Sequence, residues 1–282
     1  MLVGSALFAV MATCVGFAHR QDPGLSTFTS SAARSVVNLL ALVVISWRAP
    51  LRLVGDARPA LWARGLFGGF AMLTYFASIR YLSVGEAAFL NQTSAVWVAL
   101  LAPWLLGQAT SAAAWVAIVG SLAGVGLLAH PRPGADDTLG RALGLVSGVA
   151  AAGAYVSVNK AAATNSPATI VFWFTLMSSL ASIVLMLATG ARLPVDLATA
   201  GYLVGAGLAA TAAQLLMTAA YRDGHVASVA AAGAASPLLT TLLGWGLLDQ
   251  VPDARARFGM AVLVVCSAVL PFWGARKRRA GP

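Results

Sequence analysis

The chain has 282 residues, of which 59% are hydrophobic and only 10% are charged. A typical soluble domain is about 45–50% apolar and about 25% charged, so this composition argues against a soluble enzyme, a nucleic-acid-binding protein or a disordered scaffold. The net charge of +9 is densest at Arg276-Lys277-Arg278-Arg279, a pattern that suits anionic phospholipid better than nucleic acid.

Apolar segments follow one another along the chain, separated by short connections that carry turn residues. At roughly 20 residues per crossing, they predict ten transmembrane helices, at 2–18, 27–47, 60–79, 84–106, 111–129, 139–160, 168–189, 197–220, 226–247 and 258–273. The most polar connection, residues 130–138, separates five segments from five. We therefore predict two five-helix units, residues 1–134 and 135–282.

The distribution of Lys and Arg predicts the orientation in the membrane, because these residues are enriched in cytoplasmic connections. With the N-terminus inside, ten cations lie on the cytoplasmic side: Arg48, Arg52, Arg58, Arg64, Lys160, Arg222 and the four residues 276–279. Seven lie outside: Arg20, Arg80, Arg132, Arg141, Arg192, Arg255 and Arg257. The bias favours both termini in the cytoplasm, with the chain in a bacterial inner membrane.

The two halves align with each other. A shift of 142 positions places Arg80 on Arg222, Ser94 on Ser236 and Gln108 on Gln250. Because each unit has an odd number of helices, the second inserts upside down relative to the first. Inverted repeats of this kind are common in secondary transporters, which bind substrate near the membrane midplane between the repeats. Chance alignment of helices rich in Ala, Leu and Gly is the alternative.

Two ionisable residues are predicted to lie inside transmembrane segments, where such groups are costly and often functional. Arg34 lies in the second segment, and Glu86, the only glutamate of the chain, lies at the start of the fourth. Arg34 would bind a substrate carboxylate, or Arg34 and Glu86 together would form an external gate. The alternatives are a structural ion pair, or an arginine that extends to the membrane surface. With no carboxylate or His in the middle of any segment, we predict no buried proton relay.

Uncharged polar and aromatic residues also reach the middle of several segments. A polar cavity built from them would hold the ammonium and carboxylate groups of a substrate. Each residue alone is better explained as an interhelical contact, worth about 0.6 kcal/mol on average, whereas the set as a whole favours a cavity. The candidate substrate-binding residues are Tyr75, Ser78, Asn91, Ser94, Tyr155, Asn159, Gln214 and Thr218.

Pro237 is predicted to bend the ninth segment beside this cavity, because proline leaves a backbone carbonyl without its hydrogen-bond partner. The bend is interpreted either as a hinge or as a packing kink. The sequence contains no catalytic, metal-binding or nucleotide-binding motif, so we expect no cofactor, no metal and no ATPase subunit. The expected partners are a small-molecule substrate and membrane lipids, and the oligomeric state is left open.

Several segments resemble a known family. Ala219-Ala220-Tyr221-Arg222, Ala235-Ser236-Pro237-Leu238-Leu239 and Gly246-Leu247-Leu248-Asp249-Gln250 resemble the second EamA repeat of the drug/metabolite transporter superfamily. Leu90-Asn91-Gln92-Thr93-Ser94-Ala95 resembles the Asn-Tyr-Leu-Trp-Pro segment of its first repeat, and Arg34 occupies the place of a frequent arginine. The resemblance covers nearly the whole chain and is greatest to the YddG-like amino-acid exporters.

This resemblance implies an all-α carrier with ten transmembrane helices in two inverted five-helix repeats around a central cavity. It implies export of amino acids or related metabolites by alternating access. Ser94 stands where the family has Trp, and Ala95 stands where it has Pro, which favours a wider cavity and broader selectivity. The alternatives are efflux of cationic drugs or quaternary amines, an integral-membrane enzyme acting on lipid precursors, and a membrane scaffold without transport.

Overall fold

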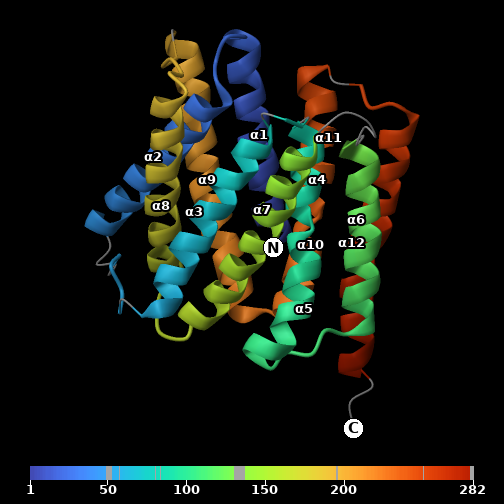
Figure 1. Ribbon diagram of the computed structural model, residues 1–282. Coiled ribbons are helices and arrows are strands. Elements are labelled where there is room, and N and C mark those ends of the chain that lie inside the picture. Colours follow the sequence, from blue (N-terminus) through green and yellow to red (C-terminus); the bar gives the residue numbers. More distant parts are fainter. Residues whose placement is uncertain are drawn as a thin grey trace.

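The computed structural model describes residues 1–48, 53–56, 58–79, 81–82, 84–129, 137–194, 196–249 and 251–279. For residues 48, 84–86, 128–129 and 267–279 it describes the backbone only. Every regular element within these ranges is a helix (Figure 1): α1 (Leu2–Gln21), α2 (Thr27–Arg48), α3 (Pro59–Ile79), α4 (Val84–Gln92), α5 (Ser94–Leu106), α6 (Ala112–Ala129), α7 (Thr138–Ala161), α8 (Pro167–Ala188), α9 (Leu197–Asp223), α10 (Val226–Gly233), α11 (Ala235–Leu248) and α12 (Ala254–Arg279).

Within the described residues, seven helical stretches are long and apolar enough to cross a membrane. They include α1, most of α2, α7, α8 and α9. The other two, Ala87–Leu106 and Val226–Leu248, each run through a pair of consecutive helices, α4–α5 and α10–α11. Large apolar side chains such as Leu66, Phe70 and Leu187 are exposed on the outside of the bundle, as expected where lipid replaces water. The prediction of an all-helical membrane protein is confirmed.

The predicted segments 84–106 and 226–247 each correspond to one candidate membrane span, but the helix within each is interrupted near its middle. Pro237 explains the second break, at Ala234, since it cannot donate to the carbonyl of Gly233 four residues earlier and its ring clashes with that carbonyl. The first break, at Thr93, forms without proline. There both the amide and Oγ1 of Thr93 donate to the carbonyl of Leu90, at 3.2 and 2.6 Å, which tightens the backbone into a turn.

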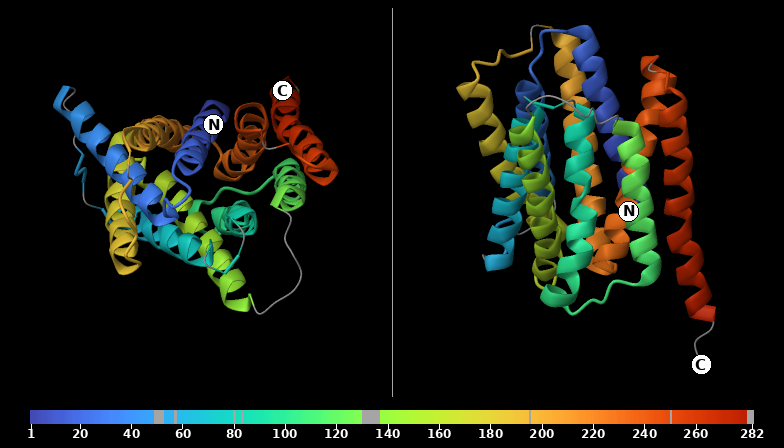
Figure 2. Two further views of the ribbon diagram at one scale, coloured as in Figure 1. Left: turned by 90° about the horizontal axis from the view of Figure 1, so that it is seen from above. Right: turned by 45° about the vertical axis from the view of Figure 1, so that its right-hand side comes forward.

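The helices pack in pairs that join distant parts of the sequence. Helix α3 packs along α7, and α1 packs along α9. Helix α2 contacts both α8 and α9, and α3 also contacts α8. Seen from above, α6 and α12 lie together at one side of the bundle (Figure 2). Glycine permits the close approach of α9 to α2 at Gly207, where a Cβ would lie 2.5 Å from Cβ of Val37. The packed pairs leave a space between them, which forms the candidate site.

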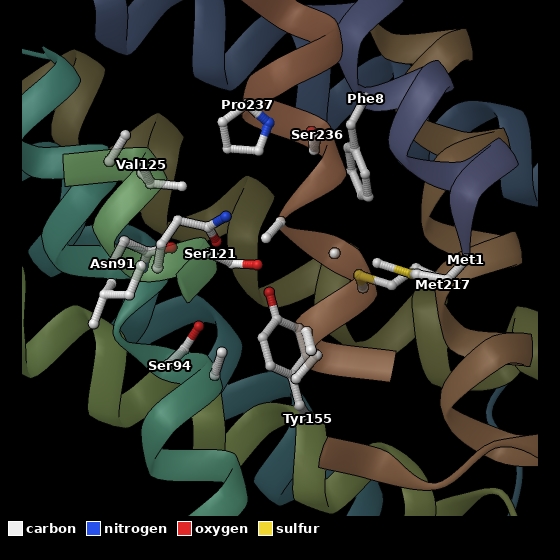
Figure 3. Close-up of a pocket in the computed structure, with 18 of the residues that line it drawn as sticks. Met1, Phe8, Asn91, Ser94, Ser121, Val125, Tyr155, Met217, Ser236 and Pro237 are labelled. Carbon is white, nitrogen blue, oxygen red and sulfur yellow. The ribbon is translucent and has the colours of Figure 1, made fainter. Parts of the chain in front are cut away.

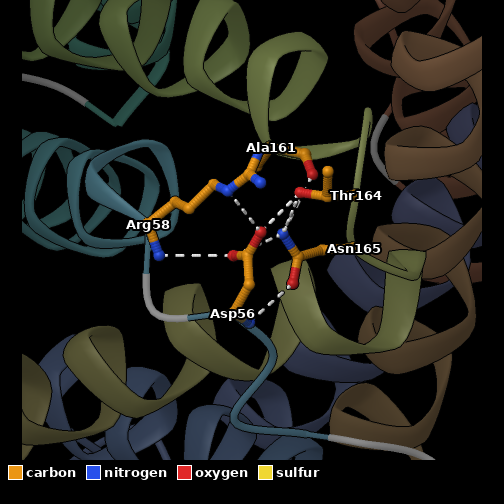
Figure 4. Close-up of polar contacts among 5 residues, drawn as sticks. All are labelled: Asp56, Arg58, Ala161, Thr164 and Asn165. Atoms are coloured by element: carbon orange, nitrogen blue, oxygen red, sulfur yellow. Dashed lines mark hydrogen bonds and ion pairs between the residues drawn. The ribbon is translucent and has the colours of Figure 1, made fainter.

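Polar contacts between connections lie at both ends of the bundle. At the end where α1 finishes, the upper end in Figure 1, the Arg192 guanidinium donates to the Asp22 carboxylate and to the Gly24 carbonyl. We call this the upper clasp. At the opposite end, Asp56 accepts from Thr164 Oγ1 at 2.6 Å and from Asn165 Nδ2 at 2.9 Å (Figure 4). This lower clasp joins the α2–α3 connection to the α7–α8 connection.

We expect the lower clasp to depend on the Asp56 carboxylate but not on pH in the neutral range. Hydrogen bonds from Thr164 and Asn165 lower the pKa of Asp56 below its usual value, which is about 3.9. Its contribution to stability is therefore complete above about pH 4 and is lost only as the pH falls through the lowered pKa. Asp56→Ala should speed amide hydrogen exchange at residues 162–166 at pH 7. Wild-type exchange, corrected for intrinsic rates, should be the same at pH 5 and pH 8.

Asp223→Asn is the matched control, because Asp223 is exposed and pairs with the adjacent Arg222. It should leave exchange at residues 162–166 unchanged. A wild-type clasp that opens between pH 8 and pH 5 would contradict the argument, as would unchanged exchange in Asp56→Ala.

Candidate functional site

A central space with two compartments lies between the helices. One compartment, of about 660 Å³, lies among α1, α2, α3, α7 and α8, and the other, of about 540 Å³, lies beside it among α4, α6, α9, α10 and α11; we name them the upper and the lower compartment. Each volume is within the usual range for small-molecule sites of roughly 300–1,000 Å³. The two share six lining residues and therefore lie next to each other. The shared residues are Ala12, Tyr75, Asn91, Tyr155, Gln214 and Met217.

The lower compartment is built around the two helix breaks. Asn91 and Ser94 line it from either side of the break at Thr93, and Ser236 and Pro237 line it from the start of α11. Figure 3 shows Asn91 and Tyr155 extending into this space from different helices. Asn91 Nδ2 donates to Ser147 Oγ at 3.0 Å, so its amide oxygen can still accept a hydrogen bond from a ligand.

Two tyrosines line the lower compartment side by side. The rings of Tyr155 on α7 and Tyr221 on α9 stack with centroids 4.9 Å apart and planes 11° apart. Tyr221 is 2% exposed and is among the largest fully enclosed side chains. On the same lower side of the bundle, α10 packs against α5 and α6.

The upper compartment holds two arginines. Among the described residues, the Arg34 guanidinium, on α2, donates only to the sulfurs of Met11 at 3.9 Å and Met72 at 3.7 Å, and sulfur is a weak acceptor. The Arg64 guanidinium, on α3, lies 4.1 Å from the centroid of the Phe174 ring. The described residues that line the two compartments include no Asp or Glu. The cavity is therefore electropositive.

Arg64 corrects the sequence analysis, which assigned this residue to a cytoplasmic connection. It is the sixth residue of α3, and it is only 2% exposed. Removing it from the cytoplasmic cations leaves nine against seven, a weaker bias than predicted. The available signal was the start of the helix at Pro59, a residue favoured in the first turn, which places Arg64 more than one turn inside. Because α3 packs between α7 and α8, this position faces protein rather than the membrane surface.

The structure brings together most of the predicted site residues. Tyr75, Asn91, Ser94, Tyr155, Gln214, Arg34 and Pro237 all line the cavity. The side chain of Glu86 lies outside the described residues, so its predicted gate with Arg34 stays a prediction. Sequence reasoning missed Arg64, Tyr221 and the two methionines beside Arg34. Methionines in apolar helices give no signal of their own, and Tyr221 is identified only by its stacking on Tyr155.

Three predicted residues lie outside the lining of both compartments, because the protein itself uses their polar groups or encloses them. Ser78 is fully buried and donates to the Tyr75 carbonyl at 2.7 Å. Asn159 Nδ2 donates to the Tyr221 carbonyl at 2.9 Å. Thr218 is fully buried on α9. Their placement favours structural roles over contact with a ligand.

Comparison with known proteins gives this cavity its context. The sequence model of the EamA-like transporter family matches residues 1–129 and 138–272. The chain belongs to the EamA-like transporter family. A crystal structure with 18% sequence identity superposes with a TM-score of 0.82 and covers 95% of each chain, which shows that the fold is shared.

Two proteins with similar sequences are transporters. The pseudopaline exporter CntI of Pseudomonas aeruginosa is 26% identical over 84% of this chain and 83% of its own length. An uncharacterized transporter of Helicobacter pylori is 27% identical over 84% of this chain and 82% of its own. This EamA-like protein is thus a multi-pass membrane transporter, and its electropositive cavity is the candidate path for the substrate.

Proposed function

We propose that this protein exports small carboxylate-bearing metabolites, amino acids among them, across a bacterial inner membrane. The observation that carries the proposal is Arg34, a cation in the cavity whose guanidinium meets only two sulfur atoms among the described residues. An arginine presents a planar set of donors that matches a carboxylate. A buried charge is costly unless it is paired, and a substrate carboxylate supplies the missing partner.

The proposed architecture is ten transmembrane helices in two inverted repeats, with both termini in the cytoplasm. The breaks at Thr93 and Ala234 support it, since they occupy corresponding places in the two halves. The contacts support it as well: exchanging each helix for its counterpart converts α3 on α7 into α9 on α1. The same exchange relates the lower clasp to the upper clasp at the opposite end of the bundle.

The conformation fits one state of an alternating-access cycle. The upper compartment reaches the upper ends of α1, α2 and α3, where His19, Thr27 and Ile79 line it. At the lower end, α10 packs on α5 and α6. With the termini inside, the cavity opens to the external side and is closed to the cytoplasm. Export then requires the short helices beside the breaks to move: α10 must leave α5 and α6 to open the cytoplasmic side, and α4 must close the external side.

The mechanism assigns each cavity group a task in binding. Arg34 holds the carboxylate through charge-assisted hydrogen bonds. The amide oxygens of Asn91 and Gln214, both on the shared lining, are suited to accept from an ammonium group. No buried carboxylate relays protons in this scheme, so the gradient of the substrate drives its transport.

Two other functions receive less support. Efflux of cationic drugs or quaternary amines needs an aromatic or acidic cage, and two arginines repel such substrates. An enzyme acting on lipid precursors needs a nucleophile beside a base. Ser30 and His19 line the upper mouth with Oγ and Nε2 3.1 Å apart, but the Ser30 hydroxyl is also placed to donate to the Ser26 carbonyl at 3.2 Å, which favours a structural role. If the protein exported cationic drugs, Arg34→Ala or Arg34→Gln would remove a charge that repels them. Drug efflux should therefore increase in either variant.

The test is uptake of radiolabelled amino acids by proteoliposomes, with and without an imposed pH gradient. Uptake above that of empty vesicles without the gradient is the expected result. Uptake that requires the gradient would contradict the absence of a proton relay and would direct attention to Glu86. Uptake of quaternary amines alone, with no amino acid transported, would overturn the proposal.

A further inference from the structure

We infer that the cavity binds substrates with two separate carboxylates, one at Arg34 and one at Arg64. This inference rests on the proposed function and extends it, because it assigns a second anionic subsite to a residue that the sequence analysis placed outside the membrane. The two arginines line the same upper compartment from neighbouring helices. The described lining provides no carboxylate for either of them.

The hydrogen bonding of Arg64 is incomplete although the residue is only 2% exposed. Its Nη2 is 3.5 Å from Gln214 Oε1, the outer limit of a hydrogen bond. Its Nε is buried and has no hydrogen-bond partner among the described residues. A cation with unused donors inside a membrane protein is costly and points to a functional partner.

The neighbours of Arg64 orient its guanidinium without neutralising it. The Phe174 ring faces the guanidinium at 4.1 Å, which stabilises a cation but leaves the edge of the group, where its donors lie, available. Gln214 is common to both compartments. The guanidinium thus lies against Gln214, beside the lining that the two compartments share.

The positions of the two arginines favour two anionic groups over one. Arg34 touches Met72, which is eight residues along α3 from Arg64. At 1.5 Å of rise per residue, Arg64 and Met72 differ by about 12 Å in backbone position, and the Arg64 guanidinium extends part of this way, to the level of Gly68. The two guanidinium groups meet different neighbours, which are Met11 and Met72 for Arg34 and Phe174 and Gln214 for Arg64. Separate surroundings favour a separate anionic group at each arginine. A molecule with a carboxylate at each end of a short chain supplies both, with its ammonium group near Asn91 and Gln214.

The experiment compares matched substrates that differ only in the second charge. Proteoliposome counterflow is measured for glutamate and glutamine, and for the longer dicarboxylates 2-aminoadipate and 2-aminopimelate. The wild-type protein should transport dicarboxylates faster than the amide, with a preference that depends on chain length. Loss of a charge-assisted contact should lower this preference about tenfold or more in Arg64→Gln. Arg64→Lys should retain part of the preference, because the charge is kept.

Controls separate the possible failures. Arg222→Gln removes an arginine that is exposed and outside the cavity, and it should leave the ratio of rates unchanged. A second measurement does not depend on whether Arg64→Gln folds. 2-Aminoadipate should raise the Tm of the purified wild-type protein by more than glutamine does. Transport of glutamine with no preference for dicarboxylates, in rate or in Tm, overturns this inference and leaves the proposed function intact. Failure to transport any amino acid overturns both.

Discussion

Replacing Arg34 by Gln is expected to reduce transport of carboxylate substrates by at least tenfold, which corresponds to about 1.4 kcal/mol of lost binding or transition-state free energy. The same substitution should leave thermal stability unchanged or higher, because the guanidinium has only two sulfurs as partners among the described residues and an unpaired charge inside a membrane is costly. Initial rates in proteoliposomes and Tm in detergent measure the two effects.

The opposite signs of these effects distinguish a binding residue from a structural one. If Arg34 held helices together, replacing it would lower both the Tm and the transport rate of the protein. Arg34→Lys should recover part of the rate, since it restores the charge without the planar donors. Arg222→Gln serves as the matched control and should transport at the wild-type rate. A full rate in Arg34→Gln would remove the observation on which the proposed function depends.

Enlarging Gly148 is expected to disable the protein at the first helix break. Gly148 lies on α7 against the turn at Thr93, where a Cβ would come within 2.5 Å of Thr93 Oγ1 and 2.9 Å of the Leu90 carbonyl. Because a backbone carbonyl cannot rotate away as a side chain does, the break itself must move. Overpacking of this kind costs about 1–3 kcal/mol. Gly148→Val should lower Tm and abolish transport, and Gly148→Ala should show a smaller loss of both.

The matched control for this substitution is Gly201→Ala on α9, where a Cβ would meet no atom within 4 Å. That variant should retain Tm and transport. If Gly148→Val transports at the wild-type rate, the α4–α5 break is not held by α7, and the position of Asn91 beside it must be set by other contacts. Loss of transport with an unchanged Tm would instead indicate that the break moves during the cycle and that Gly148 limits that movement.

The membrane environment and the helical fold were predictable because they follow from the share of hydrophobic residues rather than from the position of any one residue. A chain with 59% hydrophobic residues must bury its backbone polar groups in helices when lipid surrounds it. The place of Arg34 was predictable because it is the eighth residue of the predicted segment 27–47, about two turns beyond the preceding connection. Arg64 was misplaced because it lies five residues after Pro59, where a connection and the first turns of a helix look alike.

The division of the polar residues between cavity and packing depended on hydrogen bonds within the protein. Ser78 and Tyr75 lie on the same helix, yet only Tyr75 lines the cavity, whereas Ser78 is buried and donates to the Tyr75 carbonyl. Asn159 was equally attractive in the sequence, but its amide donates to the carbonyl of Tyr221 on α9. That pairing joins residues 62 positions apart, and spacing along one helix carries no information about it.

The sequence by itself determined the solvent, the secondary structure and the family, because hydrophobicity and turn residues act locally and persist along the chain. The tertiary structure alone decided which charges are buried together. Arg34 and Arg64 come from helices that run in opposite directions, and the packing of α3 against α7 and α8 sets their depth in one cavity. The positive charge of that cavity comes from residues on different helices, so no single segment of the sequence reveals it.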